Sequence, residues 1–434
     1  MGKVRNGCFT GAIILVLSCA AAPQVPHPLS LTEAVDLALK QASTYRGAQL
    51  SERIAAEDVT QARSAFLPKI EGRPNYIFTS PSLGPVRPRL PSYLGANAIN
   101  EIQALIVASG EIDTSGKLRA TLTRDQALLA SARAGTEVAR RDLVQGVTEA
   151  YYGLSLSAAK RAGSEKNLAS AEEFETNTRL QLDAGEVAPV DLVRARLQTA
   201  ARRDELEQAR TDESVNLNGL RLLIGYAFTE PLAVTDLLTE APVDNEVERF
   251  AEATISTRPE FAQFEADKKA AESEIRIARA DRRPQFTYSI SSGFISDSLA
   301  ANHLKDSTGA QVNIGVTIPI FDWGAARSRE TQARLRLEQA ENSRAIAERQ
   351  FAQAFFTARA QAISARTRIR QIGASITDAE ANVAASTARY RSGEATITEV
   401  VDAQNTLVTQ KTALYQALFD YQTARAHLMR AAGQ

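Results

Sequence analysis

Cysteine, histidine, tryptophan and methionine are all scarce in this sequence of 434 residues. There are two cysteines, three histidines, one tryptophan and two methionines, and aromatic residues make up only 6%. A His-based metal site within one chain is not expected, because the histidines are far apart in sequence. Since no Ser/His/Asp elbow, phosphate loop, zinc spacing or paired-carboxylate cleft stands out, we expect no catalytic residue, metal or cofactor. The histidines are His27, His303 and His427.

An excess of charge of one sign is also lacking, because 50 lysines and arginines face 51 aspartates and glutamates. A chain without a basic excess offers no electrostatic reason to bind nucleic acid. Both cysteines, Cys8 and Cys19, lie near the N-terminus, so the rest of the chain cannot contain an intramolecular disulfide. The stability of that part must come from packing.

The N-terminus has the order of an export signal: basic residues, an apolar stretch at 12–17, then small residues. The stretch is far shorter than the roughly 20 residues that a membrane-spanning helix needs. The run Val-Leu-Ser-Cys at 16–19 resembles a lipobox. It predicts a lipoprotein signal peptide over 1–19 and acylation of Cys19, with attachment to outer-membrane lipid. The alternative is cleavage beyond Cys19, at the small residues 20–22.

The remainder repeats one plan twice, with a first structural repeat over 29–242 and a second over 243–434. Each repeat is expected to hold a helix, two strands and a long helical hairpin. Two pairs of glycines recur with an offset of 208, and a pair of prolines differs by 216, so the first repeat has about eight extra residues in a loop. The pairs are Gly116 and Gly324, Gly185 and Gly393, and Pro68 and Pro284.

Proline is absent from two long stretches, which permits uninterrupted helices over 118–183 and 326–391. Each would have 66 residues, or roughly 100 Å at 1.5 Å per residue. Apolar residues at steps of seven predict coiled-coil packing, and a glycine at each tip lets the chain reverse. Helices over 31–66 and 189–223 would stack end to end and cover one long helix.

Alternation with period two marks two strands in each repeat, clearly over 286–291 and 311–318 and less regularly over 70–76 and 101–106. One face would be apolar and the other polar, which favours an outer-membrane barrel over an ordinary sandwich. Four strands per chain cannot close alone, and eight would fill their own interior. Three chains with twelve strands therefore make the smallest conduit.

The predicted fold class is mainly α with a membrane β-barrel. It is a trimeric α/β channel-tunnel, in which four strands per chain form a twelve-stranded barrel above a long periplasmic coiled-coil α-barrel. The single tryptophan, Trp323, follows the last strand and is predicted to be a membrane-interface anchor. The alternative is a tryptophan packed at the strand-to-helix joint.

From about Leu29 to the C-terminus, the chain resembles the TolC-like outer-membrane efflux family. The resemblance is carried by the duplicated halves, by Ala-Arg and Leu-Pro before the first strand, by Pro-Ile-Phe-Asp-Trp-Gly after the fourth, and by the glycine-containing tips. It implies a homotrimeric exit duct in the outer membrane of a Gram-negative bacterium, with a large periplasmic part and no enzyme activity. Such a duct passively conducts small molecules from an inner-membrane efflux pump, here of the resistance-nodulation-division type, through a periplasmic adaptor.

The resemblance also implies roles for the two tips. In relatives, an aspartate after the first tip bonds a tyrosine before the second and helps to hold the periplasmic entrance shut. Asp191 and Tyr390 occupy these positions, whereas Ala395 replaces an arginine that some relatives use. The adaptor is expected to dock around the tip residues Gly185, Glu186, Gly393 and Glu394.

Glu399 and Asp402 lie three residues apart on one helix face. In a trimer they would form acidic rings at the entrance, which would favour cations. A solvated helix face is the alternative.

For the chain as a whole, a type I secretion exit channel for polypeptides and a periplasmic adaptor or scaffold of the same machinery remain alternatives. Two hairpins argue against an adaptor, which has one.

Overall fold

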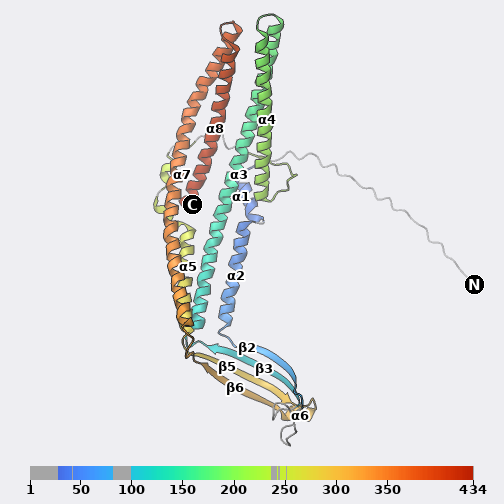
Figure 1. The fold of residues 1–434 in the computed structure, drawn as a ribbon, viewed down its shortest axis with the longest axis vertical. Helices are drawn as coiled ribbons and strands as arrows, with labels where there is room; N and C mark the ends of the chain where they lie inside the picture. Colours follow the sequence, from blue (N-terminus) through green and yellow to red (C-terminus); the bar gives the residue numbers. More distant parts are fainter. Residues whose placement is uncertain are drawn as a thin grey trace, which may run out of the picture.

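The computed structural model describes residues 28–41, 43–81, 99–235, 242, 245–250 and 252–433. The leader, including Cys19, lies outside these residues. The molecule is long and narrow, with a β-sheet at one end and the tips of two helical hairpins at the other (Figure 1). Within the described residues, no helix combines the length and the hydropathy needed to cross a membrane.

Two helices of equal length run along the molecule. α3 (Lys117–Asp183) and α7 (Ala325–Arg391) each have 67 residues, or about 100 Å at 1.5 Å per residue. The helices predicted over 118–183 and 326–391 are therefore confirmed, each beginning one residue earlier than expected.

The hairpins close through two equivalent turns. α4 (Pro189–Ile224) returns from the first tip and α8 (Ile397–Ala431) from the second. Gly185 and Gly393 both have a φ of +77°, in the left-handed region. The amide that follows each glycine donates to the carbonyl five residues earlier at 2.8 Å, as in a Schellman motif. The two repeats thus use the same turn to reverse the chain.

The single helix predicted over 31–66 is wrong, because the structure has two helices there, α1 (Leu31–Lys40) and α2 (Thr44–Ser64). Gln41 is extended, and the Ser43 side chain caps α2 by accepting a backbone N–H. The expected covering still occurs, since α2 lies along the sheet-proximal half of α3 and α4 along the tip half (Figure 1).

The remaining short elements pack around the two long helices. α5 (Pro259–Ala280) packs against both α3 and α7 in the sheet-proximal half (Figure 1). Two helical turns, η1 (Val247–Arg249) and η2 (Glu252–Thr257), precede it, and α6 (Ala301–Asp306) lies between the last two strands.

A small parallel ribbon near the middle of α3 joins β1 (Pro28–Leu29) to β4 (Ala233–Val234). The buried Tyr151 of α3 holds the ribbon in place: its hydroxyl donates to the Leu29 carbonyl at 2.7 Å and accepts the Thr235 amide at 3.0 Å. The start of the described chain is thereby fixed halfway along the helical body.

The main sheet has four antiparallel strands in the order β2 (Lys69–Phe78), β3 (Asn100–Ile112), β5 (Gln285–Ser296) and β6 (Thr308–Thr317). Both predicted strand pairs are present, and the two repeats meet where β3 pairs with β5. β2 and β6 are the outer strands, so each has one side that is unpaired within the described chain. The connection from β2 to β3 is 79–99, which is longer than 297–307 in the second repeat, as predicted.

The strand register gathers apolar residues on one face of this sheet. Tyr76 pairs with Ile102, and Tyr288 pairs with Ile314, while Glu71 and Ser289 lie on the opposite, mostly polar face. The large apolar side chains of the first face are exposed in the single chain. They include Ile70, Tyr76, Phe78, Ile106, Ile112, Ile290, Val312, Ile314 and Val316.

Candidate functional site at the hairpin tips

The two hairpins touch near their tips through a small apolar cluster. Ala195 of α4, Tyr390 of α7, and Ile397 and Val400 of α8 are buried together. The ring of Phe174 on α3 lies 5.8 Å from that of Tyr390, measured between centroids. Residues about 200 positions apart in the sequence thus pack together, and the sequence analysis, which predicted a contact of Tyr390 with Asp191, did not include this apolar cluster.

Tyr390 is only 8% exposed, and its hydroxyl has no hydrogen-bond partner among the described residues. Burial raises the pKa of Tyr390, the nearby negative charge of Asp191 raises it further, and the Thr178 hydroxyl has a smaller, opposite effect. Asp191 is partly buried in the first turn of α4, where the helix dipole favours a carboxylate. Its Oδ1 lies 4.0 Å from Nη1 of Arg194. Asp191 therefore acts on Tyr390 electrostatically, but the hydrogen bond predicted between the two residues is not formed in this chain.

Glu399 is engaged inside its own hairpin. Its carboxylate completes a capping box with Thr396 at the start of α8 and pairs with Arg389 of α7 at 3.2 Å. Asp402 is exposed one turn further along α8. Because Arg389 offsets the charge of Glu399, the two predicted acidic residues are not equivalent, and Asp402 is the better source of an acidic ring.

The four residues predicted to dock an adaptor lie at the ends of the hairpins. Gly185, Glu186, Gly393 and Glu394 are all exposed. Ala395 faces inward and packs against the apolar cluster of the tips. The hairpin ends are thus free within the single chain.

Trp323 lies at the other end of the molecule, where β6 leads into α7. It is 90% exposed and has a φ of +56°, and its ring lies 4.8 Å from that of Phe321. The neighbouring Asp322 starts α7 by accepting the amides of Gly324 and Ala326. Trp323 therefore projects from the strand-to-helix joint instead of being packed inside it.

The described residues hold no group of three or more histidine, cysteine, aspartate or glutamate side chains arranged to bind a metal ion. The polar chemistry of the tips consists of hydrogen bonds and ion pairs between helices. Such contacts can hold two hairpins together or release them.

The family model described as "Outer membrane efflux protein" matches residues 34–226 and 251–434. The chain belongs to this family, whose members are outer-membrane channels. The resemblance to TolC-like proteins that the repeats and tip motifs implied is thereby confirmed, and with it the prediction of an outer-membrane efflux protein.

Individual relatives match over most of their length. The chain is 24% identical over 433 residues to the outer membrane efflux protein BepC of Brucella suis biovar 1 (strain 1330), covering 98% of this chain and 90% of BepC. It is 22% identical over 399 residues to the outer membrane protein TolC of Escherichia coli (strain K12), covering 87% of this chain and 77% of TolC. The structure of the outer-membrane channel OprN superposes with a TM-score of 0.82 at 19% identity, covering 93% of this chain and 89% of OprN. The predicted channel-tunnel fold of one chain is thus confirmed.

Proposed function

We propose that this chain is the outer-membrane exit duct of a tripartite efflux system and that it works as a homotrimer. The observation that carries the proposal is the four-stranded sheet, which has an exposed apolar face and leaves β2 and β6 each with an unpaired side. Unpaired backbone groups are costly in lipid. Pairing of β6 in one copy with β2 in the next, around three copies, would close a twelve-stranded barrel with a polar interior.

In this arrangement α3 and α7 carry the duct about 100 Å away from the membrane. The hairpin tips then form the periplasmic entrance. A periplasmic adaptor docks at Gly185, Glu186, Gly393 and Glu394 and connects the duct to an inner-membrane pump of the resistance-nodulation-division type. The duct itself conducts passively, without catalysis, and Trp323 lies at the membrane interface.

The entrance is held shut in part by Tyr390 and Asp191. Support comes from the burial of Tyr390 between the hairpins and from the nearby charge of Asp191. Parting the hairpins would expose the apolar cluster around Tyr390 to water, which costs free energy and so favours the closed form.

Planar-bilayer recording of the purified full-length protein tests the proposal. We expect a trimer that conducts, and we expect a higher resting conductance when Tyr390→Phe is combined with Asp191→Ala. Tyr415→Phe, which removes a hydroxyl from α8 far from the tips, serves as the control. A protein that stays monomeric in outer membranes, or that never conducts, would contradict the duct. Export of a polypeptide in place of small molecules would favour the type I alternative.

A further inference from the structure

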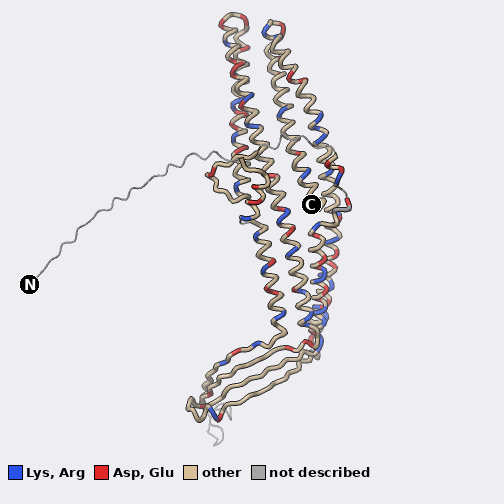
Figure 2. Tube along the Cα trace, turned by 180° about the vertical axis from the view of Figure 1, so that it is seen from behind, with Lys and Arg blue, Asp and Glu red and all other residues tan. Residues whose placement is uncertain are grey.

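Ion pairs tie the two helices of each hairpin to one another. Charged residues of both signs follow the hairpins up to their tips (Figure 2). Opposite charges from the two helices meet at hydrogen-bonding distance. The pairs include Arg203 with Glu172 at 2.8 Å in the first hairpin, and Arg389 with Glu399 at 3.2 Å and Lys411 with Glu380 at 2.9 Å in the second. Each hairpin is therefore stabilised as a unit by charge.

The polar contacts from the first hairpin to the tip half of the second are of another kind. Between the middle of α3 and the tips, four side chains of the first hairpin donate hydrogen bonds to uncharged oxygens on α8. Arg194 donates to Thr398 at 3.2 Å, Gln198 to Gln404 at 2.8 Å, Lys160 to Gln416 at 3.2 Å, and Arg202 to Asn405. These eight residues are called the polar seam below.

Arg202 shows how the polar seam can part at low cost. Its side chain is buried, with the whole residue 7% exposed, but its carboxylate partner Glu205 is on the same helix, 2.7 Å from Nη1. Separation of α4 from α8 would break the bond to Asn405 and leave the cation paired. A buried cation whose partner moved away would instead resist separation strongly.

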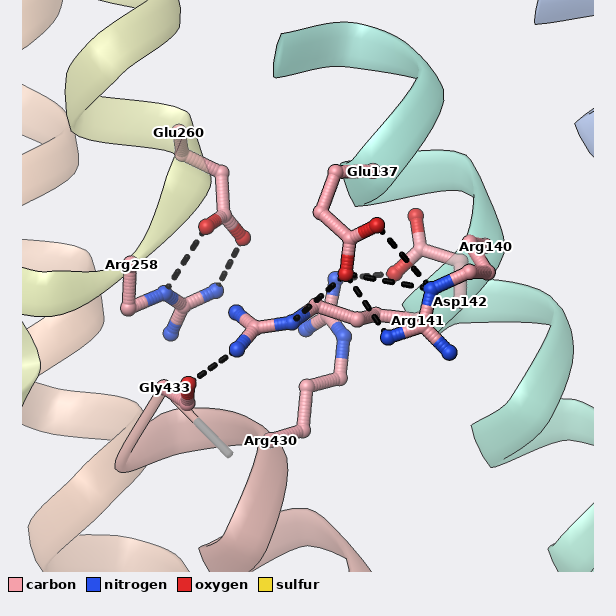
Figure 3. Close-up of polar contacts among 8 residues, drawn as sticks. All are labelled: Glu137, Arg140, Arg141, Asp142, Arg258, Glu260, Arg430 and Gly433. Atoms are coloured by element: carbon pink, nitrogen blue, oxygen red, sulfur yellow. Dashed lines mark hydrogen bonds and ion pairs between the residues drawn. The ribbon is translucent and has the colours of Figure 1, made fainter. Parts of the chain in front are cut away.

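Near the middle of α3, the contact between the hairpins becomes ionic. Figure 3 shows Arg430, near the C-terminal end of α8, paired with Asp142 of α3, beside Arg141. Nε2 of His427 lies 2.6 Å from Oε1 of Glu149. α8 is therefore bound to carboxylates of the first hairpin at its C-terminal end, with Arg430 and Asp142 as the ion pair, and by uncharged acceptors toward the tip.

We propose that the polar seam, and Asn405 in particular, sets how readily the second hairpin swings away from the first at the entrance, with the ionic contacts at the C-terminal end of α8 as the pivot. The inference rests on the proposed duct. It adds to the proposed gate residues Tyr390 and Asp191 a set of positioning residues on α3, α4 and α8, which extends away from the tip. Asn405 is the adjustable member, because a change of one atom there converts a neutral acceptor of Arg202 into a carboxylate.

The test compares two opposite changes at Asn405 in full-length trimers in planar bilayers at fixed salt. Asn405→Asp gives Arg202 a charge-assisted partner, and we expect the open probability to fall by roughly tenfold. Asn405→Ala removes the acceptor, and we expect the open probability to rise by about the same factor. Asn382→Asp makes the same charge change at an exposed position of α7 and should leave gating unchanged.

A double variant ties the effect to the pair. Arg202→Gln added to Asn405→Asp should return the open probability to near its wild-type value. Heat-modifiable trimers on gels show that each variant assembles. The inference would be overturned if both Asn405 variants conduct but change the open probability in the same direction, or not at all. It would also be overturned if Asn405→Asp still lowered the open probability in the absence of Arg202. Wild-type protein that never conducts would instead overturn the duct itself.

Discussion

The two repeats share one backbone plan but differ in the side chains that occupy matching positions. Their long helices both have 67 residues, and their return helices have 36 and 35. At the offset of 208 residues, Tyr151 corresponds to Arg359 and Arg194 corresponds to Asp402. Tyr151 anchors a ribbon that the described part of the second repeat lacks. Duplication has thus preserved lengths and turns, while anchoring and charge have diverged.

The largest expected effect tests the divergence at Tyr151. This side chain is fully buried, so Tyr151→Ala should create a cavity and release the ribbon, at a cost of about 3–5 kcal/mol in the free energy of unfolding. Arg359→Ala, at the matching position, should cost much less, because the buried Nε of Arg359 has no hydrogen-bond partner in the described chain. Denaturant unfolding of both variants measures the difference. Equal losses would show that the two positions are equivalent after all.

A second prediction concerns Tyr421, which also lacks a tyrosine counterpart in the first repeat. Burial and the negative charge of Glu246 raise the pKa of Tyr421 to about 12. In the unfolded chain this phenol ionises near pH 10. The contribution of the protonated Tyr421 phenol to the free energy of unfolding is therefore complete below pH 10. It falls by about 2 kcal/mol as the pH rises toward 12. The melting temperature should decline less steeply across this pH range in Tyr421→Phe than in the wild-type protein. Identical pH profiles of the two proteins would contradict the raised pKa of Tyr421.

The tip glycines test what the repeats have in common. Gly185→Ala and Gly393→Ala place a side chain at a φ of +77° in the same kind of turn. Each should destabilise the protein by about 1 kcal/mol. Thermal unfolding of the two single variants should give matching losses. A clear inequality would show that the two turns are not under the same constraint.

The smallest effect concerns charge at the entrance. Asp402→Asn should reduce cation selectivity more than Glu399→Gln, because Arg389 already offsets the charge of Glu399. Reversal potentials under a salt gradient measure both variants. Equal shifts would restore the original expectation of two equivalent acidic rings.

Local signals in the sequence were enough to predict the long helices and the strands. The absence of proline permitted α3 and α7, whose predicted bounds agree with the structure to within one residue, and period-two alternation identified both faces of the sheet. The break between α1 and α2 was missed because the apolar period continues through it. Ser43, a favourable N-cap residue, was the available signal.

The contacts between hairpins were beyond prediction from local pattern. Arg194, Gln198 and Arg202 recur every four residues on α4, which indicates one helix face but not its neighbour. That neighbour is α8, more than 200 residues away in the sequence, and its approach depends on how both hairpins curve. The resemblance to known channels gave Asp191 and Tyr390, whereas the polar seam came only from the structure.

The hydrogen bond from Tyr151 to Leu29 also limits the reach of the N-terminal segment. Tyr151 is 34 residues from the start of α3 beside the sheet, or about 51 Å along the helix. Leu29 is ten positions after Cys19, and ten residue steps of chain span at most about 36 Å. With the sheet in the outer membrane, a lipid on Cys19 could enter that membrane only after β1 had left its place beside β4. If Cys19 is acylated in the proposed arrangement, membrane tethering and pairing of β1 with β4 are therefore alternative states of the chain.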